Sequence, residues 1–219
     1  MNMESTEYSL DELLCQSLSQ YRQNRFYDDS FESEQKASNM LEEAWALVNN
    51  TGNCVDMAKM GCALEYLVQT FYINCNTDKL LNNMDKALIT FWKKKKSDCL
   101  EVFPVYLWFG YYFLLRFRNR RSVFHSRDKR MVANVLSFLV DTFRKFKTKT
   151  ISVEVLPLFS SNVWDETVCW VEQVHDSGLC EKQSASLLYQ LYDLRKTEVS
   201  DDVPVRDALL QWILEFYCF

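Results

Sequence analysis

Glycine and proline are scarce in this chain, which holds 4 Gly and 3 Pro among its 219 residues. All-β folds need many tight turns, and such turns consume both residues. Long helices joined by short polar loops need few of either. No phosphate-binding loop of the form G-x-x-x-x-G-K-S/T or G-x-G-x-x-G is present. The composition therefore favours an all-α fold and argues against a phosphate-cradling glycine loop.

Histidine is scarcer still, because the chain contains only His125 and His175. A Ser-His-Asp or Cys-His catalytic site would have to use one of them. The sequence pairs neither histidine with a nucleophile. The eight cysteines are scattered and form no C-x-x-C pair, so the ligand spacing of a structural zinc site is missing. We therefore predict a protein that is not an enzyme, with no catalytic residues, no metal and no cofactor.

A membrane-spanning run is also missing. Residues 102–115 are uncharged and strongly apolar, but they number 14, whereas a spanning helix needs about 20. Pro104 and Gly110 interrupt them. This stretch predicts a helix buried in the protein core and no membrane partner, with a re-entrant or interfacial segment as the alternative. The N-terminus is acidic and polar, unlike a secretory signal. Together with cysteines that fit reduced thiols, this predicts an intracellular protein, nuclear or cytoplasmic.

Apolar residues recur at helical spacing along most of the chain. Ser9 and Glu12 match a capping box at the start of the first helix. The polar stretch 24–34 is predicted to be a loop, and residues 148–155 an extended linker. The later helices are predicted over about 33–48, 54–73, 80–96, 98–118, from 128 into the basic stretch after 143, 163–175, 182–197 and 204–217.

About eight or nine helices with short loops predict a compact multi-helix bundle or a short α-solenoid. We expect a single helical domain over residues 1–219, with residues 1–8 as a flexible N-terminus and any subdivision near 148–160. The segment 202–214 has the sequence DVPVRDALLQWIL. It resembles the second half of a HEAT or armadillo repeat, where an Asp and an Arg flank a small residue before an apolar helix. This resemblance, confined to the last helix, implies an α-solenoid whose concave face binds a partner.

Charge is sorted into three blocks along the chain. Residues 1–78 carry 4 Lys/Arg and 13 Asp/Glu, residues 79–149 carry 17 and 5, and residues 150–219 carry 4 and 12. The blocks therefore have formal charges of −9, +12 and −8, which sum to the net charge of −5. Such asymmetry bears on partners rather than on fold. The candidate surface for a partner or a nucleic acid consists of Lys93, Lys94, Lys95, Lys96, Arg116, Arg118, Arg120, Arg121, Arg127, Lys129, Arg130, Arg144, Lys145, Lys147 and Lys149.

Three interpretations of these cations stay open. They cap helix ends and pair with the acidic flanks, they bind an acidic protein partner, or they neutralise the phosphates of a nucleic acid. Four aromatic residues alternate with the cations, as stacking platforms in single-strand binders do, and equally as an ordinary apolar face does: Phe117, Phe124, Phe143 and Phe146. The run Lys93–Lys96 also matches a short nuclear localisation signal. Up-down helix packing predicts that residues 116–130 lie at one pole and the other two basic groups at the opposite pole.

Aromatic content suggests how the protein acts. The chain holds 6 Trp, 11 Tyr and 15 Phe, and Trp and Tyr are preferred anchors of protein interfaces. We therefore predict a non-catalytic adaptor or scaffold subunit of a complex that binds another protein through a helical groove. The alternative is a nucleic-acid-associated subunit that uses the basic block 93–149. The oligomeric state is left open.

Overall fold

Helices make up almost all of the chain that the computed structural model describes, namely residues 8–27, 31–94, 103–147, 161–198, 209, 211 and 212. The helices of these ranges are α1 (Leu10–Tyr27), α2 (Phe31–Thr51), α3 (Cys54–Gln69), α4 (Thr77–Leu80), α5 (Asn82–Lys94), α6 (Phe103–Arg118), α7 (His125–Lys147), α8 (Ser161–Asp176) and α9 (Glu181–Glu198). No strand occurs in the same ranges, so the predicted all-α class is confirmed.

The first helix begins where the sequence predicts. The backbone N–H of Ser9 donates to Glu12 Oε2 at 2.8 Å, and the N–H of Glu12 donates to Ser9 Oγ at 3.3 Å. This reciprocal capping box satisfies two N–H groups that the first turn of a helix leaves unpaired. The same hydrogen bonds, first that from the Ser9 backbone, lower the pKa of Glu12.

The loop predicted over residues 24–34 is wrong, although residues 28–30 lie outside the described ranges. Helix α1 continues to Tyr27, and α2 already begins at Phe31. The polar residues bond across the hairpin of α1 and α2: the hydroxyl of Ser33 donates to Asn24 Oδ1, and that of Ser17 donates to the carbonyl of Ala37 at 2.8 Å. Polarity here marks a helix–helix contact rather than a loop.

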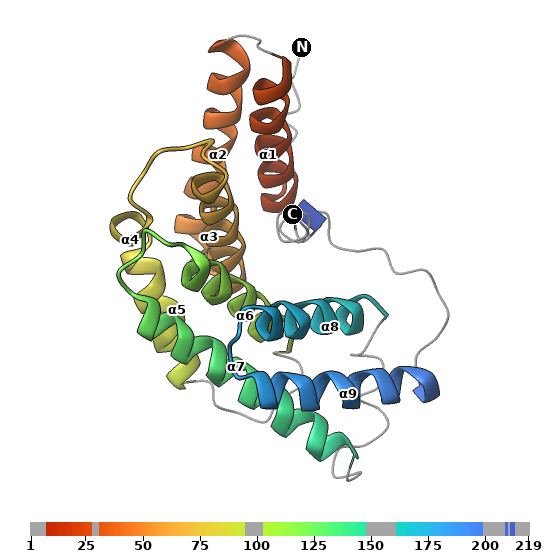
Figure 1. Ribbon diagram of the computed structural model, residues 1–219. Helices are drawn as coiled ribbons and strands as arrows, with labels where there is room; N and C mark the ends of the chain where they lie inside the picture. Colours follow the sequence, from red (N-terminus) through yellow and green to blue (C-terminus); the bar gives the residue numbers. More distant parts are fainter. Residues whose placement is uncertain are drawn as a thin grey trace.

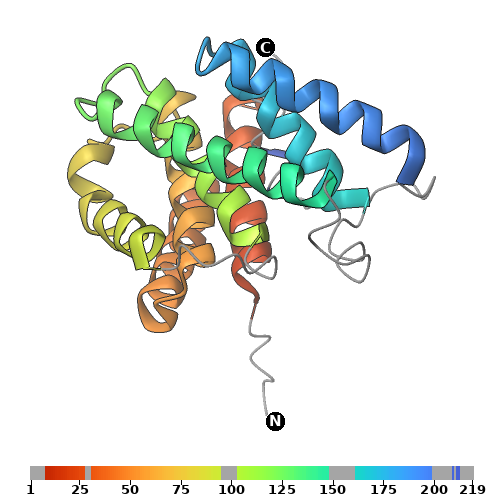
Figure 2. The ribbon, with the colours of Figure 1, turned by 90° about the horizontal axis from the view of Figure 1, so that it is seen from below.

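Helix α6 forms the centre of the fold. It packs against α3 on one side and against α7 and α8 on the other, and residues 106–115 are all buried. Figure 1 shows α1, α2 and α3 grouped at one end of the molecule, and Figure 2 shows α7, α8 and α9 lying together on the other side. The prediction that the apolar stretch 102–115 is a core helix is therefore confirmed for the part that the structure describes. None of the described helices combines the length and the hydropathy needed to cross a membrane.

Two glycines let α6 approach its neighbours closely. A Cβ atom on Gly61 of α3 would lie 2.3 Å from the ring of Tyr112, and one on Gly110 of α6 would lie 2.6 Å from the indole of Trp170. Both distances are shorter than side-chain packing permits, so only glycine fits at these two crossings.

Several predicted segments fall on residues that the structure does not describe. These are the N-terminus before Tyr8, the linker at 148–155 with the subdivision near 148–160, and most of the repeat-like segment 202–214. Within that segment Leu209 is fully buried and the ring of Trp212 lies 5.2 Å from the guanidinium carbon of Arg22. Trp212 therefore packs against α1, and Figure 1 shows this short described segment beside one end of α1.

Candidate functional site

Two turns meet at the end of the molecule where α3 and α6 terminate. One connects α3 to α4, and the other connects α6 to α7. Asp78 of α4 joins them, because its Oδ1 accepts from the hydroxyl of Ser122 and its Oδ2 from the backbone N–H of Val123, both at 2.8 Å. We call this region, residues 70–80 and 119–124, the turn junction.

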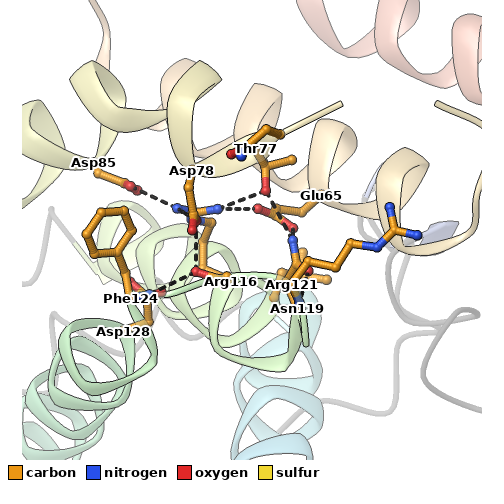
Figure 3. A network of polar contacts seen from close by, with 12 residues as sticks. Glu65, Thr77, Asp78, Asp85, Arg116, Asn119, Arg121, Phe124 and Asp128 are labelled. Atoms are coloured by element: carbon orange, nitrogen blue, oxygen red, sulfur yellow. Dashed lines mark hydrogen bonds and ion pairs between the residues drawn. The ribbon is translucent and has the colours of Figure 1, made fainter. Parts of the chain in front are cut away.

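A buried ionic cluster lies beneath the turn junction, with Arg116 at its centre (Figure 3). Arg116 is completely shielded from solvent. Its Nη1 pairs with Glu65 Oε1 at 2.6 Å, and its Nη2 pairs with Asp78 Oδ1 at 2.8 Å and with Asp85 Oδ2 at 3.1 Å. One guanidinium group therefore ties together α3, α4, α5 and α6, each of which contributes one residue.

A second arginine extends this cluster to α7. Arg127 Nη1 pairs with Asp85 Oδ2 at 2.8 Å, and its Nη2 pairs with Asp128 Oδ1 at 2.7 Å. The guanidinium also lies over the ring of Phe124, 4.4 Å from its centroid. We call the six charged residues the Arg116 cluster: Glu65, Asp78, Asp85, Arg116, Arg127 and Asp128.

Neutral hydrogen-bond donors complete the cluster. The amide of Asn119 donates to Glu65 Oε2 at 2.8 Å and to Thr77 Oγ1 at 3.1 Å, and the hydroxyl of Tyr112 donates to Asp85 Oδ1 at 2.6 Å. Burial, and then the charge of Asp85, raises the pKa of Tyr112 well above its usual range, so the phenol keeps its proton. Buried carboxylates with this many partners hold the surrounding helices in one arrangement.

The acids of the cluster differ in their electrostatic environment. Burial raises the pKa of Asp128 to about 6, and the hydrogen bond and charge of Arg127 offset this only in part. Asp128 Oδ2 is buried and has no hydrogen-bond partner among the described residues. Partial burial also opposes ionisation of Asp78, but the bonds from Val123 and Ser122 and the charge of Arg116 outweigh it, so its pKa lies below the usual value.

The Arg116 cluster corrects the predicted basic surface. Arg116 is interior and Arg127 is mostly buried, and both pair with acids of the cluster. Arg118 donates to the side-chain oxygen of Gln173 at 2.9 Å and to its carbonyl at 2.8 Å, so it fastens α6 to α8. The physical reason is that Arg116 is paired with Glu65 and Asp78 of the first acidic block, and that Asp85 and Asp128 of the basic block itself pair with Arg127.

The remaining predicted cations lie in two separate regions. Arg120, Arg121, Lys129 and Arg130 are exposed at or near the turn junction, and Lys93 and Lys94 are exposed at the end of α5. The exposed Arg144 pairs with Asp141 at 3.6 Å near the end of α7, next to the half-buried Lys145. Lys95, Lys96 and Lys149 lie outside the described residues, as does the side chain of Lys147.

The contacts between α5 and α7 show how these regions are separated. The two helices run in the same direction away from the turn junction, because Asp85 meets Arg127 near their starts and Trp92 meets Phe138 further along. The basic ends of both helices therefore lie away from the junction. The predicted stacking platform also changes, since Phe143 is fully buried and Phe117 packs edge-on against His125.

A pocket opens at the turn junction, directly above the Arg116 cluster. Its volume is about 290 Å³, and its lining consists of Val68, Asn74, Cys75, Asn76, Thr77, Asp78, Asn119 and Arg121. Phe71 stands beside it with 74% of its surface exposed, and the guanidinium carbon of Arg121 lies 5.4 Å from the centroid of its ring. Val123, on the α6–α7 side, is 79% exposed. We call Phe71, Arg121 and Val123 the rim.

Two groups that could act as nucleophiles, Cys75 and Ser184, have neighbours that can be described. Burial, and then the charge of Glu65, raises the pKa of the Cys75 thiol in the pocket, which favours the protonated form. His175 Nδ1 lies 3.1 Å from Ser184 Oγ, a pairing that the sequence did not reveal. Ser184 is fully buried and bonds to carbonyls of its own helix, so this pair joins α8 to α9. Among the residues with described positions, no group of His, Cys, Asp and Glu has the arrangement of a metal site.

The acids of the cluster and Phe71 were not among the predicted site residues. One signal was available: Glu65 is a single charge among the otherwise apolar residues 62–68 of α3, and a buried acid needs a cation. The position of Phe71 depends on where α3 ends, which helical spacing alone did not determine.

Comparison with family models, with curated proteins and with solved structures finds no match to this chain.

Proposed function

We propose that the protein is a non-catalytic adaptor or scaffold subunit that binds another protein at the turn junction. The observation that carries this proposal is Phe71, a large apolar residue in a left-handed backbone conformation with φ of 64°. A left-handed conformation costs a residue with a side chain roughly 1–2 kcal/mol, and for a bulky residue it is an outlier. The ring is 74% exposed, so burial in the core does not offset this cost.

The hydrogen bonds that follow the end of α3 form a common capping pattern, but Phe71 is an unusual residue for its position in that pattern. The N–H of Phe71 donates to the carbonyl of Val68 at 3.2 Å, and that of Tyr72 donates to the carbonyl of Leu67 at 2.9 Å. This is the Schellman pattern, in which the left-handed position is usually glycine. Helix α8 ends with the same pattern, and there the position is held by Gly178 with φ of 70°. Folding alone would therefore accept glycine at position 71, which supports a role in binding for the phenylalanine.

The cluster beneath the rim supports the same proposal. A partner binds more tightly to a surface that needs no ordering on association. The Arg116 cluster and the bonds of Asp78 hold both turns in place, so the rim stands on a rigid base. Most other aromatic residues do not contribute to such a surface, because the largest of them are fully buried, among them Tyr106, Tyr112 and Trp170. The aromatic content of the residues whose side chains are described is thus explained mainly by the core.

The alternative, a nucleic-acid-associated subunit, is supported by the exposed Arg120, Arg121, Lys129 and Arg130. It is weakened by the internal pairing of Arg116, Arg127 and Arg118 described above. Phosphate binding depends on the number of cations that reach the backbone, and the remaining exposed cations lie in two regions.

The test is affinity capture from cell extract with the full chain, using Phe71→Asn and Tyr189→Gln as matched variants. Asparagine tolerates the left-handed conformation, and Tyr189 of α9 is 75% exposed, so each variant removes one exposed ring without disturbing the fold. We expect a stoichiometric partner with the wild type and with Tyr189→Gln, and its loss with Phe71→Asn. Equal capture by all three proteins would contradict the proposal, as would capture that is abolished by added nuclease.

A further inference from the structure

The charges around the pocket identify the kind of partner that fits it. Three cations of the turn junction, Lys79, Arg120 and Arg121, are exposed, and none of them forms an ion pair with a described residue. The one acid in the lining is Asp78, whose oxygens already accept from Arg116, Ser122 and Val123. The pocket therefore presents unpaired positive charge above an acid that is already neutralised.

The position of Arg121 favours recognition of a carboxylate. Its backbone N–H donates to Asn119 Oδ1 at 3.0 Å, which ties the residue to the Arg116 cluster. Its guanidinium carbon lies 5.4 Å from the centroid of the Phe71 ring, and Figure 3 shows the group directed away from the cluster. A guanidinium stacked on a ring loses little freedom when its edge binds a carboxylate through two parallel hydrogen bonds. The stack thus prepares Arg121 for an acidic group.

The surroundings of Arg121 are suited to a peptide. Asn74 and Asn76 line the pocket and carry amide groups of the kind that bond to a peptide backbone. The exposed Val123 and the free edge of Phe71 offer apolar contact to a neighbouring side chain. Arg121 lies over one face of the Phe71 ring, which reduces the ring area left for a stacked nucleobase.

We infer that the pocket at the turn junction binds an acidic segment of the partner protein, with a carboxylate of that segment on Arg121 and an adjacent apolar side chain on Phe71 and Val123. This inference rests on the proposed function and specifies the chemistry of its partner. A pocket of about 290 Å³ accommodates one or two side chains, so the segment is short and its anchor is a pair of neighbouring residues, one acidic and one apolar.

The test is selection of random displayed peptides, roughly twelve residues long, against the full chain. The selected peptides are then measured by fluorescence anisotropy against the wild type, Arg121→Gln, Phe71→Asn and Lys93→Gln. Lys93 is an exposed cation at the far end of α5, so its variant removes one charge away from the pocket. A single-stranded oligonucleotide of the same net charge serves as the competing ligand.

We expect the selected peptides to carry Asp or Glu beside an aliphatic or aromatic residue. Removing a charged hydrogen-bonding partner from a recognition site should weaken binding about tenfold or more in Arg121→Gln, with a comparable loss in Phe71→Asn and none in Lys93→Gln. The inference is overturned if no acidic preference emerges, if Arg121→Gln binds as well as the wild type, or if the oligonucleotide binds more tightly than the peptides. Capture of a partner that depends on Phe71, combined with any of these results, would leave the proposed function standing and reject the acidic segment alone.

Discussion

Arg116 and Arg121 belong to one basic cluster in the sequence, yet they occupy opposite environments. Arg116 is completely buried and pairs with three carboxylates. Arg121 is exposed and contacts a phenyl ring. The last turn of α6 directs the first arginine toward α3, α4 and α5, whereas the second follows the end of that helix. The density of charge along the sequence therefore predicted neither environment. The two arginines differ because α6 ends between them.

The two arginines also differ in what they contribute to the free energy of unfolding. An exposed charge is screened by water and contributes little. A buried cation that balances several acids contributes strongly to the free energy of unfolding, because its removal leaves those acids desolvated and unpaired. The stability of the protein should therefore respond strongly to changes within the Arg116 cluster and weakly to changes at the rim, where binding should respond instead.

The largest effect is expected for Arg116→Met, which keeps the length of the side chain and removes its charge. Glu65, Asp78 and Asp85 would then be buried without their shared cation, and the free energy of unfolding should fall by about 4 kcal/mol. Arg121→Met is the matched control and should change it by less than about 0.5 kcal/mol. Urea denaturation followed by circular dichroism measures both. Equal effects of the two variants would remove the distinction between the two arginines.

The next effect concerns Asp128 and pH. Its pKa is about 6 in the folded protein against 3.8 for an ordinary aspartate, so the folded state binds a proton more readily than the unfolded state. Its carboxylate opposes folding above pH 6, and this penalty disappears as the pH falls toward 4. The wild type should therefore gain stability relative to Asp128→Asn by up to about 3 kcal/mol over that range.

Asp78 provides the opposite pH response for comparison. Its pKa is lowered in the folded protein, so its contribution is present above its unfolded pKa and is lost as the pH falls through the folded value. The free energy of unfolding of Asp78→Asn should therefore be lower than that of the wild type at neutral pH, and the two should become equal only in strong acid. Denaturant titrations of wild type and both variants at several pH values check the two directions. A pH-independent difference between wild type and Asp128→Asn would show that Asp128 does not titrate in this range.

A smaller effect is expected for Gly61→Ala, which acts on the cluster through packing. The added methyl group would meet the ring of Tyr112, whose hydroxyl bonds to Asp85. Overpacking of this kind costs about 2 kcal/mol. Thermal unfolding should show a lower midpoint for Gly61→Ala. Gly52→Asn is the control, because no atom lies within 4 Å of a Cβ at position 52 and asparagine tolerates its left-handed conformation. A larger loss in Gly52→Asn would contradict this account.

The smallest effect is expected for Phe71→Gly, and its sign is opposite. Glycine relieves the left-handed conformation while little packing is lost, so the free energy of unfolding should rise by about 0.5–1 kcal/mol. The same variant should lose the captured partner. A higher thermal midpoint together with lost binding would separate stability from function at the rim, and a lower midpoint would show that the ring supports the fold.

Sequence patterns predicted the fold better than the site, for a physical reason. The capping box at Ser9 and the apolar run of α6 are local, so their structural consequence is carried by neighbouring residues. The pairing of Glu65 with Arg116 joins residues 51 positions apart and exists only after α3 and α6 have packed. The left-handed Phe71 was missed for a different reason, since the apolar spacing of α3 continues through it and offers no sign that the helix stops.

The contact between Arg22 and Trp212 has a consequence for the kinetics of folding. It joins α1 to residues near the opposite end of the chain, so it requires the closure of a very long loop, which is entropically costly and slow to form. Contacts that form after the transition state govern the rate of unfolding more than the rate of folding. The packing of Trp212 on α1 would then mainly set the rate of unfolding, while the packing of the helices around α6 would mainly set the rate of folding.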